Sequence, residues 1–401
     1  MVRASRLLLV LVHLTAFAAI GAATTPLSAQ SLAELVALAE MGDPQAQCDL
    51  GTYYSEGPGV EPDFARARAW FLKAARQGHA EAQRRLGRLH HFVDPDAYDP
   101  ARAARWYTRA AEQGDAIAEN NLGNLYFAGR GVPHDPDRGL ALLRRAADRG
   151  LADAQYNLGS AFAKGEGVEP DCVLADQWYR HAAKQGHLSA MHNLGVLLAE
   201  EGCGSAGPKE AAKWYRRAAE QGHAGACHNL GMLYRQGRGV ELDYEEAFAW
   251  FLRGAELGDA WSQAAVGVAY QKGRGIEPDY HESVRWLRLA AAQGDESGLC
   301  NLGYMHDRGW GVPQDDGAAL RLYHAAANAG SSQCQFNLGV FYRDGRGTTP
   351  DPLAAYVWFT LAERAGIANG AVKAKDMRRQ LTPAQLAEAE RRLAEWTPAS
   401  E

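Results

Sequence analysis

Apolar and small residues recur along this chain with a period of 36 positions. One glycine, usually preceded by Leu, returns from Gly51 to Gly339, and a second series keeps the same phase from Gly78 to Gly366. A fixed period of this length is typical of a tandem array, in which each unit packs only on its neighbours. We therefore expect nine units without insertion or deletion, at residues 43–78, 79–114, 115–150, 151–186, 187–222, 223–258, 259–294, 295–330 and 331–366.

Each unit is predicted to contain two helices. In the fourth unit Ala154, Leu158 and Phe162 follow one another at helical spacing, which places them on one stripe of a first helix. Gly165 then ends that helix, because glycine tolerates the backbone of a C-terminal cap. A second helix should follow an N-cap aspartate. The aspartates at this place are Asp63, Asp99, Asp135, Asp171, Asp243, Asp279, Asp315 and Asp351.

The second helices share a large ring and a pair of small residues. In the fourth unit Trp178 lies four residues before Ala182 on one helix face, where the next hairpin is expected to interlock with it. The pattern predicts an all-α fold, an α-solenoid of helix-turn-helix units. Both ends need caps. We expect a capping helix at residues 30–42 and a capping region at 367–401, with Thr382 as the N-cap of the last helix.

Residues 224–258 carry the repeat nearly complete: Ala-x-Ala-x-x-x-Leu-Gly-x-x-Tyr-x-x-Gly-x-Gly-Val-x-x-Asp, followed by a Trp and a final Ala-x-x-Gly. This pattern resembles the Sel1-like repeat, a relative of the tetratricopeptide repeat. Two units depart from it, since the second has Phe92-Val93-Asp94-Pro95 in place of the turn glycines and the fifth shifts them to Gly202 and Gly204. The resemblance implies an α-solenoid adaptor that binds other proteins and specifies no particular partner.

The N-terminus has the pattern of an export signal. Arg3 and Arg6 precede an apolar run, and small residues follow it, which predicts a signal peptide at residues 1–29 with Ala23 as the other cleavage candidate. The run is too short for a good membrane span. We expect a mature protein in the bacterial periplasm, or secreted, with 40 basic against 48 acidic residues and a net charge of −8. This balance argues against nucleic-acid binding.

The six cysteines lie in six different units. Cysteine-rich relatives pair two cysteines within one repeat, and that scheme is absent here. Cys172 and Cys203 fall at the same end of adjacent units and form a candidate disulfide. Cys334 occupies a small apolar position, where a buried thiol is expected.

The sequence offers no catalytic or metal-binding constellation. Gly-x-Gly runs such as Gly237-Arg238-Gly239 follow a helix and not a strand, and neither a phosphate-binding loop nor a Cys-x-x-Cys or His-Glu-x-x-His pattern occurs. β-Lactamase activity has been attributed to some cysteine-rich relatives, but Ser-x-x-Lys, Ser-Asp-Asn and Lys-Thr-Gly are absent. We expect no enzyme and no cofactor, with a β-lactamase-like enzyme as the weaker alternative.

Two surfaces are candidates for binding. Asparagine stands directly before the Leu of the first helix in six units, on a flank where it either grips the backbone of an extended peptide or bonds the adjacent repeat. These residues are Asn121, Asn157, Asn193, Asn229, Asn301 and Asn337. The leading hypothesis is an exported scaffold that binds a protein or peptide and regulates an envelope complex or sensor. The alternative is a structural protein that binds an anionic envelope polymer through Arg130, Arg238, Arg274 and Arg346 of the turns.

Overall fold

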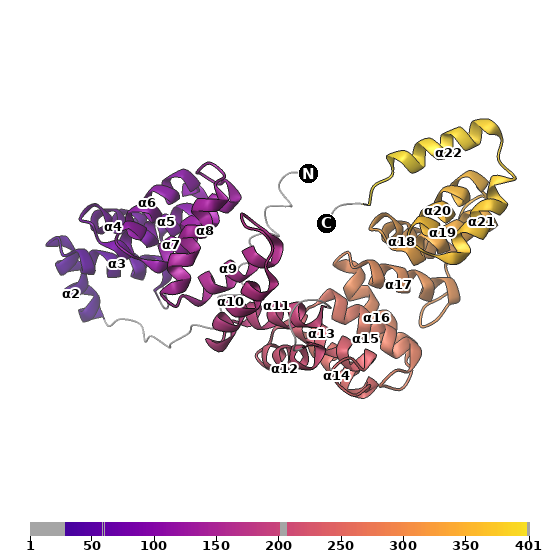
Figure 1. The fold of residues 1–401 in the computed structure, drawn as a ribbon, viewed down its shortest axis with the longest axis horizontal. Coiled ribbons are helices and arrows are strands. Elements are labelled where there is room, and N and C mark those ends of the chain that lie inside the picture. The colour runs from indigo at the N-terminus through magenta and orange to yellow at the C-terminus, as the bar shows by residue number, and fades with distance from the viewer. Residues whose placement is uncertain (1–28, 58, 60, 201–206, 399–401) are drawn as a thin grey trace. The chain divides into compact units, whose positions relative to one another are not determined.

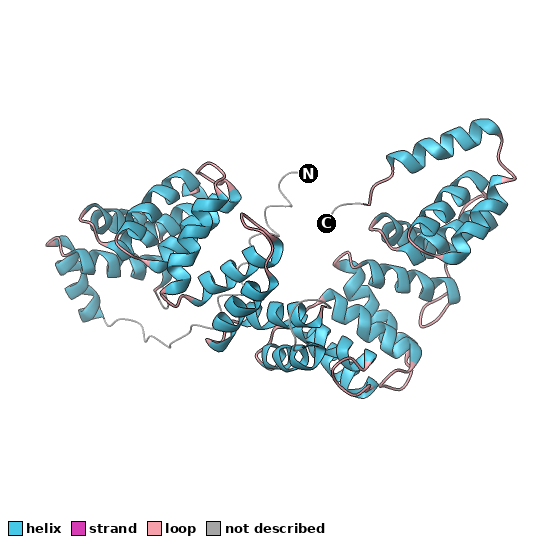
Figure 2. Cartoon of the chain, viewed as in Figure 1, coloured by secondary structure: helices cyan, strands magenta, loops and turns pink. Residues whose placement is uncertain are grey.

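The computed structural model describes residues 29–57, 59, 61–200 and 207–398. All regular elements within these residues are helices (Figure 2). The chain divides into two compact parts, Met1–Ala182 and Ala183–Glu401. From here on these two parts are called the first and the second unit, and the nine tandem elements are called repeats. This confirms the predicted all-α solenoid, because successive helices pack as hairpins on their sequence neighbours.

In the first unit a capping helix precedes the first four repeats (Figure 1). The second repeat lacks the turn glycines, and its first helix continues into a π-helical turn and a short 3-10 helix. The elements are α2 (Ala29–Glu40), α3 (Pro44–Glu56), α4 (Phe64–Arg76), α5 (Ala80–Arg88), η2 (Leu89–Val93), η3 (Pro95–Ala97), α6 (Pro100–Glu112), α7 (Ala116–Ala128), α8 (Pro136–Asp148), α9 (Ala152–Lys164) and α10 (Cys172–Lys184), the last of which ends beyond the unit boundary.

The second unit holds five repeats and two further helices. Its repeats are formed by α11 (Leu188–Ala199), α12 (Gly207–Glu220), α13 (Ala224–Gln236), α14 (Tyr244–Glu256), α15 (Ala260–Lys272), α16 (Tyr280–Ala292), α17 (Glu296–Arg308), α18 (Asp316–Asn328), α19 (Ser332–Asp344) and α20 (Pro352–Arg364). After them α21 (Ala368–Arg378) forms an additional first-type helix that the sequence did not predict. The final helix α22 (Pro383–Glu395) begins at Thr382, which forms a capping box with Gln385.

The predicted aspartate caps are present at the second helices. Asp243, for example, accepts the amides of Glu245 and Glu246 at 2.9 and 3.0 Å. The first helices have caps of their own, which are aspartate in some repeats and histidine in others. His223 accepts the Ala226 amide on Nδ1 at 3.1 Å, and a neutral imidazole nitrogen is required for this bond.

The periodic glycine of the first helix makes room for a buried side chain of the second helix. A Cβ on Gly231 would lie 2.6 Å from Cε1 of Phe251, a distance that packed carbon atoms do not tolerate. The residue that fills this space directly follows the Trp of the second helix, or the Leu that replaces it at Leu142 and Leu322, and it is 3% exposed or less. The residues are Phe71, Tyr107, Leu143, Tyr179, Tyr215, Phe251, Leu287, Tyr323 and Phe359.

The tryptophan of the second helix packs on the preceding repeat. Trp106, from the second repeat, lies against a cluster that contains Phe71 of the first repeat. Trp358, from the ninth, lies against a cluster that contains Tyr323 of the eighth. A basic side chain covers some of these rings, as where the Arg217 guanidinium lies 4.8 Å from the Trp214 ring centre. The tryptophan thus packs at the junction of two repeats. The residue after it fills the space beside the glycine of its own repeat and also reaches the next repeat, as where the Tyr323 and Phe341 ring centres lie 5.1 Å apart.

A buried polar side chain ties the repeats together at their closed ends. Gln263 donates to the Ala255 carbonyl of the preceding repeat at 3.3 Å and accepts from Gln293 at 2.8 Å. In the third repeat Glu119, which is fully buried, replaces the glutamine and pairs with Arg149 at 2.8 Å and Arg145 at 2.6 Å. The buried side chains of Gln263 and Glu119 thus have partners, as is usual for polar groups in an interior.

Candidate functional site

The six predicted asparagines are all partly buried on the flanks of their first helices. Two of them bond the preceding first helix. Asn157 donates to Asn120 at 2.8 Å, and Asn229 lies 3.0 Å from Nε2 of His192. Each bond spans 37 residues, one repeat plus one position. These contacts favour the alternative in which the amides hold adjacent repeats together.

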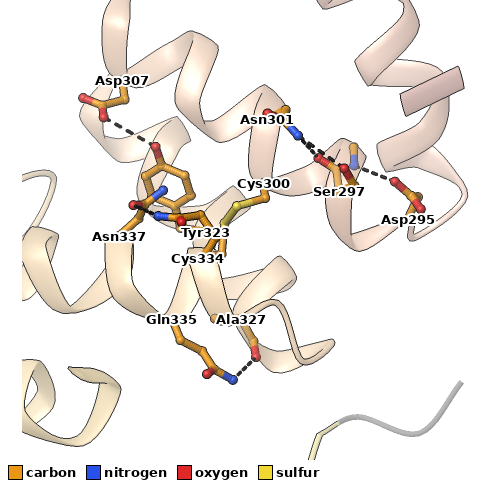
Figure 3. The surroundings of a disulfide bond; sticks show 12 residues. Asp295, Ser297, Cys300, Asn301, Asp307, Tyr323, Ala327, Cys334, Gln335 and Asn337 are labelled. Atoms are coloured by element: carbon orange, nitrogen blue, oxygen red, sulfur yellow. Dashed lines mark hydrogen bonds between the residues drawn. A yellow bond between two sulfur atoms is a disulfide. The ribbon is translucent and has the colours of Figure 1, made fainter. Parts of the chain in front are cut away.

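Two other asparagines, Asn301 and Asn337, have hydrogen bonds within their own helix. Asn301 donates to the Ser297 carbonyl at 2.8 Å, and Asn337 accepts from Gln333 at 3.2 Å (Figure 3). Such partly exposed local bonds are exchangeable for bonds to a ligand. In the seventh repeat Ala265 takes the asparagine position, so the row is interrupted there. The role of the asparagines as a peptide ladder therefore remains a prediction.

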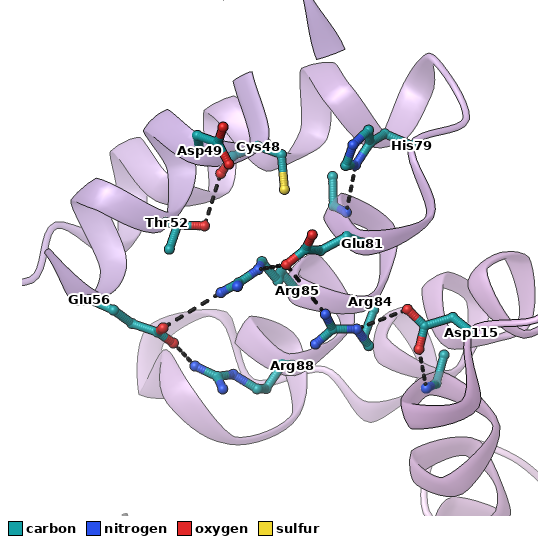
Figure 4. A network of polar contacts seen from close by, with 12 residues as sticks. Cys48, Asp49, Thr52, Glu56, His79, Glu81, Arg84, Arg85, Arg88 and Asp115 are labelled. Atoms are coloured by element: carbon teal, nitrogen blue, oxygen red, sulfur yellow. Dashed lines mark hydrogen bonds and ion pairs between the residues drawn. The ribbon is translucent and has the colours of Figure 1, made fainter. Parts of the chain in front are cut away.

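In the first unit the same flank carries charge. Arg85 stands at the asparagine position of the second repeat and bonds Glu81 at 2.8 Å (Figure 4). Nη1 of the same guanidinium group lies 3.5 Å from the carboxylate of Glu56 in the preceding repeat. Arg84, next to it, bonds Asp115 of the following repeat at 2.9 Å. These pairs link neighbouring repeats by ionic contacts, where Asn157 of the same unit uses an amide.

An exposed tryptophan marks the flank in the second unit. Trp261, in the first turn of α15, is 62% exposed, and its ring lies 6.0 Å from that of His228. The equivalent positions of neighbouring repeats hold Gly225 and Ser297. The sequence signal for this site is an aromatic residue at a position where the neighbouring repeats have small residues. A search for residues that recur in every repeat does not detect it.

Histidines line the flank beside Trp261. His192 stacks on His223 with ring centres 4.6 Å apart. Burial lowers the pKa of His192 and of His228, and burial together with the neighbouring His192 lowers the pKa of His223 to about 4. These rings are therefore neutral at pH 7. The flank presents neutral amide, imidazole and indole groups beside the carboxylate of Asp259, and neutral groups of this kind can bond the backbone of a peptide.

Comparisons with known proteins place this architecture in a family. A model of the Sel1 repeat matches nine segments, residues 44–79, 80–115, 116–151, 152–187, 188–223, 224–259, 262–295, 297–331 and 332–367. The chain belongs to the Sel1 repeat family. Sel1 repeat proteins typically mediate protein–protein interactions and are generally non-catalytic.

Two solved structures resemble this Sel1 array over most of its length. A protective antigen of uropathogenic Escherichia coli with the SLR fold is 33% identical, with a TM-score of 0.76, over 92% of this chain and 79% of the antigen. A Sel1 repeat protein from Oxalobacter formigenes is 26% identical, with a TM-score of 0.59, over 87% of this chain and 92% of the other. A search of curated proteins found no match.

The arginines of the Sel1 turns are partly used inside the protein. Arg238 donates to the Ala199 carbonyl at 2.8 Å, and Arg346 pairs with Asp307 at 2.6 Å and with Asp316. Arg274 lies over the Tyr244 ring at 5.7 Å. Because two of these four side chains already have protein acceptors, the turns do not offer an uninterrupted row of free cations.

The cysteines differ from one prediction. Cys334 is not a free thiol, because it forms a disulfide with Cys300, with Cα atoms 5.8 Å apart (Figure 3). The two residues are separated by 34 positions instead of 36. They occupy different positions in their repeats, and comparing equivalent positions alone does not reveal such a pair. The predicted bridge from Cys172 remains a prediction, since Cys203 lies outside the described residues.

Among the residues that the structure describes, Cys48 and Cys227 are free cysteines, and both are buried. Burial raises the pKa of Cys48 to about 12, so its thiol stays protonated and unreactive at neutral pH. In the described parts of the chain no three His, Cys, Asp or Glu side chains lie together as metal ligands would. Nor is any helix among these residues long and apolar enough to cross a membrane.

Proposed function

We propose that this protein is an exported, non-enzymatic scaffold that binds an extended segment of a partner protein along the first-helix flank of its second unit. Membership of the Sel1 repeat family supports a protein partner. The E. coli relative is a protective antigen, a description that is compatible with export. Arg3, Arg6 and the apolar run that follows them also support export.

The exposed ring of Trp261 is the observation that carries the proposal. Tryptophan is enriched among the residues that dominate binding energy at interfaces, and a ring 62% exposed gives the isolated protein little stability in return. The amide of Asn301, on the next first helix, donates to the carbonyl and the hydroxyl oxygen of Ser297 in its own helix. The indole can contact an apolar side chain of a peptide, and the amides beside it can bond the peptide backbone.

The proposal is tested by purifying the mature protein with its bound partner from envelope extracts. Trp261→Ala should weaken capture of a partner recovered at stoichiometric level by at least tenfold, since hot-spot residues contribute about 2 kcal/mol or more. Leu289→Ala is the matched control, because Leu289 is 43% exposed on a second helix of the same unit. Equal capture by the two variants would count against the Trp261 flank as the binding surface.

The same extracts separate the polymer-binding alternative from the scaffold. A polymer-binding protein should sediment with peptidoglycan, and this should depend on the turn arginines and not on Trp261. Arg238 and Arg346 already bond protein acceptors, so the contacts described above favour the scaffold.

A further inference from the structure

A small pocket lies at the junction of the sixth and seventh repeats, between α13, α14 and α15. Ala265 is part of its wall, at the position where six other repeats carry asparagine. The short side chain leaves the aromatic ring of Phe251 facing a space of about 20 Å³, which holds one water-sized group. Arg235 and Arg274 form the polar side of the pocket. The interruption of the asparagine row thus coincides with a cavity.

The two arginines at this pocket have no acidic partner. The Arg235 guanidinium lies 5.9 Å from the Phe251 ring centre, and that of Arg274 lies 5.7 Å from the Tyr244 ring centre. Across the described residues, neither side chain has an ion pair with a carboxylate. Burial and the positive charge of Arg274 lower the pKa of Arg235. Arg235 is partly buried and Arg274 is exposed; these like charges repel one another, and an anion between them would relieve this repulsion.

The junction of the eighth and ninth repeats shows how the protein satisfies the same arrangement internally. Seventy-two residues after Arg235 and Arg274, two repeats along, stand Asp307 and Arg346. Arg346 pairs with Asp307 at 2.6 Å and with Asp316, the equivalent of Tyr244. There a carboxylate fills the place that Arg235 occupies in the earlier junction. The repeat geometry therefore accommodates a carboxylate beside the turn arginine.

We propose that the pocket of Arg235 and Arg274 binds a carboxylate of the partner polypeptide, from an Asp or Glu side chain or from its C-terminus. Planar guanidinium groups recognise carboxylates through paired hydrogen bonds. The space admits one oxygen of that carboxylate, and the carbon atoms attached to it would lie outside, next to the exposed Arg274 side chain. This inference rests on the proposed function and names the chemical group that the second unit recognises.

Calorimetric titration of the mature chain at constant ionic strength tests the pocket with three peptides and inorganic phosphate. N-acetyl-Ala-Ala-Leu carries a C-terminal carboxylate, N-acetyl-Ala-Asp-Ala-amide carries a side-chain carboxylate, and N-acetyl-Ala-Ala-Leu-amide carries neither. We expect one or both carboxylate peptides to bind at least tenfold more tightly than the amide, and the tighter of the two identifies the source. Phosphate binding as tight as that of the peptides would overturn the assignment to a carboxylate.

Variants of the pocket provide the second half of the test. Arg235→Ala and Arg274→Ala should each weaken the carboxylate peptide by at least tenfold, whereas Arg288→Ala, an exposed arginine on α16, should not. Arg235→Asp places a carboxylate where Asp307 stands two repeats later, so it should abolish peptide binding without lowering the melting temperature. Unchanged peptide binding in these pocket variants overturns the inference.

Partner capture distinguishes this inference from the scaffold proposal. If the carboxylate peptides do not bind but the Trp261-dependent partner is still captured, the pocket is rejected and the scaffold stands. If the peptides bind and no partner is captured, the scaffold fails while the carboxylate site remains.

Discussion

Replacement of Gly231 by Ala should destabilise the second unit, although the same change in the interior of an exposed helix stabilises by about 1 kcal/mol. The new methyl carbon would lie 2.6 Å from Phe251 Cε1 and 3.1 Å from the Ala247 carbonyl oxygen. Carbon atoms in contact prefer about 3.5–4.0 Å, so the ring must retreat by about 1 Å. Phe251 is 3% exposed and packs in one cluster with Val266 and Trp286, so most of its surroundings are filled and the ring can yield only slightly into the space of about 20 Å³ beside it.

The expected magnitude follows from these two opposing effects. Overpacking of a core costs about 1–3 kcal/mol, and we expect the upper part of this range because backbone and aromatic ring both confine the methyl group. Set against the helix gain of about 1 kcal/mol, the net loss is about 1–2 kcal/mol. For a unit of this size that corresponds to a fall in melting temperature of roughly 2–8 °C.

Circular dichroism during thermal and urea unfolding measures the effect. Gly317→Ala is the matched control, because its methyl group would meet only the Asp315 and Arg321 side-chain ends at 3.3 and 3.7 Å; it should be neutral or stabilising. In the background of Phe251→Ala, which itself costs about 3–5 kcal/mol, the Gly231 substitution should no longer destabilise. A higher melting temperature for Gly231→Ala alone, or additive losses in the double variant, would refute the packing argument.

Three further predictions concern binding, pH and export. The first variant replaces three asparagines by Ala, and the residues are Asn193, Asn229 and Asn301. If their amides bond the partner, binding should weaken at least tenfold with little change in melting temperature. Lowered stability with unchanged affinity would instead assign these amides to the packing of adjacent repeats. Because burial lowers the folded-state pKa of His223 from 6.5 to about 4, its contribution to stability should be complete above pH 6.5 and decline by up to about 3 kcal/mol as the pH falls to 4. His223→Asn, which keeps a cap without titrating, should remove this part of the pH dependence, and an unchanged urea midpoint profile would contradict it. The protein recovered from cells should begin near Gln30 or Thr24 and be released by permeabilising the outer membrane, and full-length protein in the cytosol would exclude export.

The sequence predicted those features that recur in every repeat. Glycine and aspartate act locally, through backbone conformation and capping, so a position such as Asp243 reveals its role without knowledge of the fold. The buried residue after the tryptophan recurs with the same period, but the period alone does not show that it fills the space beside the glycine. Phe251 contacts Gly231 of its own repeat, and that partnership requires the angle between two helices, which spacing alone does not supply.

The features that distinguish one repeat from another were harder to predict. The disulfide of Cys300 and Cys334 joins unlike positions of adjacent repeats, and the exposure of Trp261 depends on what surrounds it. The absence of a partner for Arg235 becomes apparent only beside the Asp307–Arg346 pair. Periodicity identifies the common scaffold, whereas these departures depend on contacts between neighbours that no single repeat encodes.

The buried polar pairs of the third and seventh repeats have a consequence for how such chains evolve. Gln263 and its partner Gln293 lie in the same repeat, as do Glu119 and Arg149, and only their bonds to backbone carbonyls cross into the preceding repeat. Every residue has a backbone carbonyl, whatever its side chain. A copied repeat therefore contains both side chains of the pair and requires no particular side chain in its new neighbour. Gene duplication or recombination at a repeat boundary can therefore lengthen the array. It can also place a repeat with Glu and Arg beside one with two Gln, and no buried charge is left without its partner.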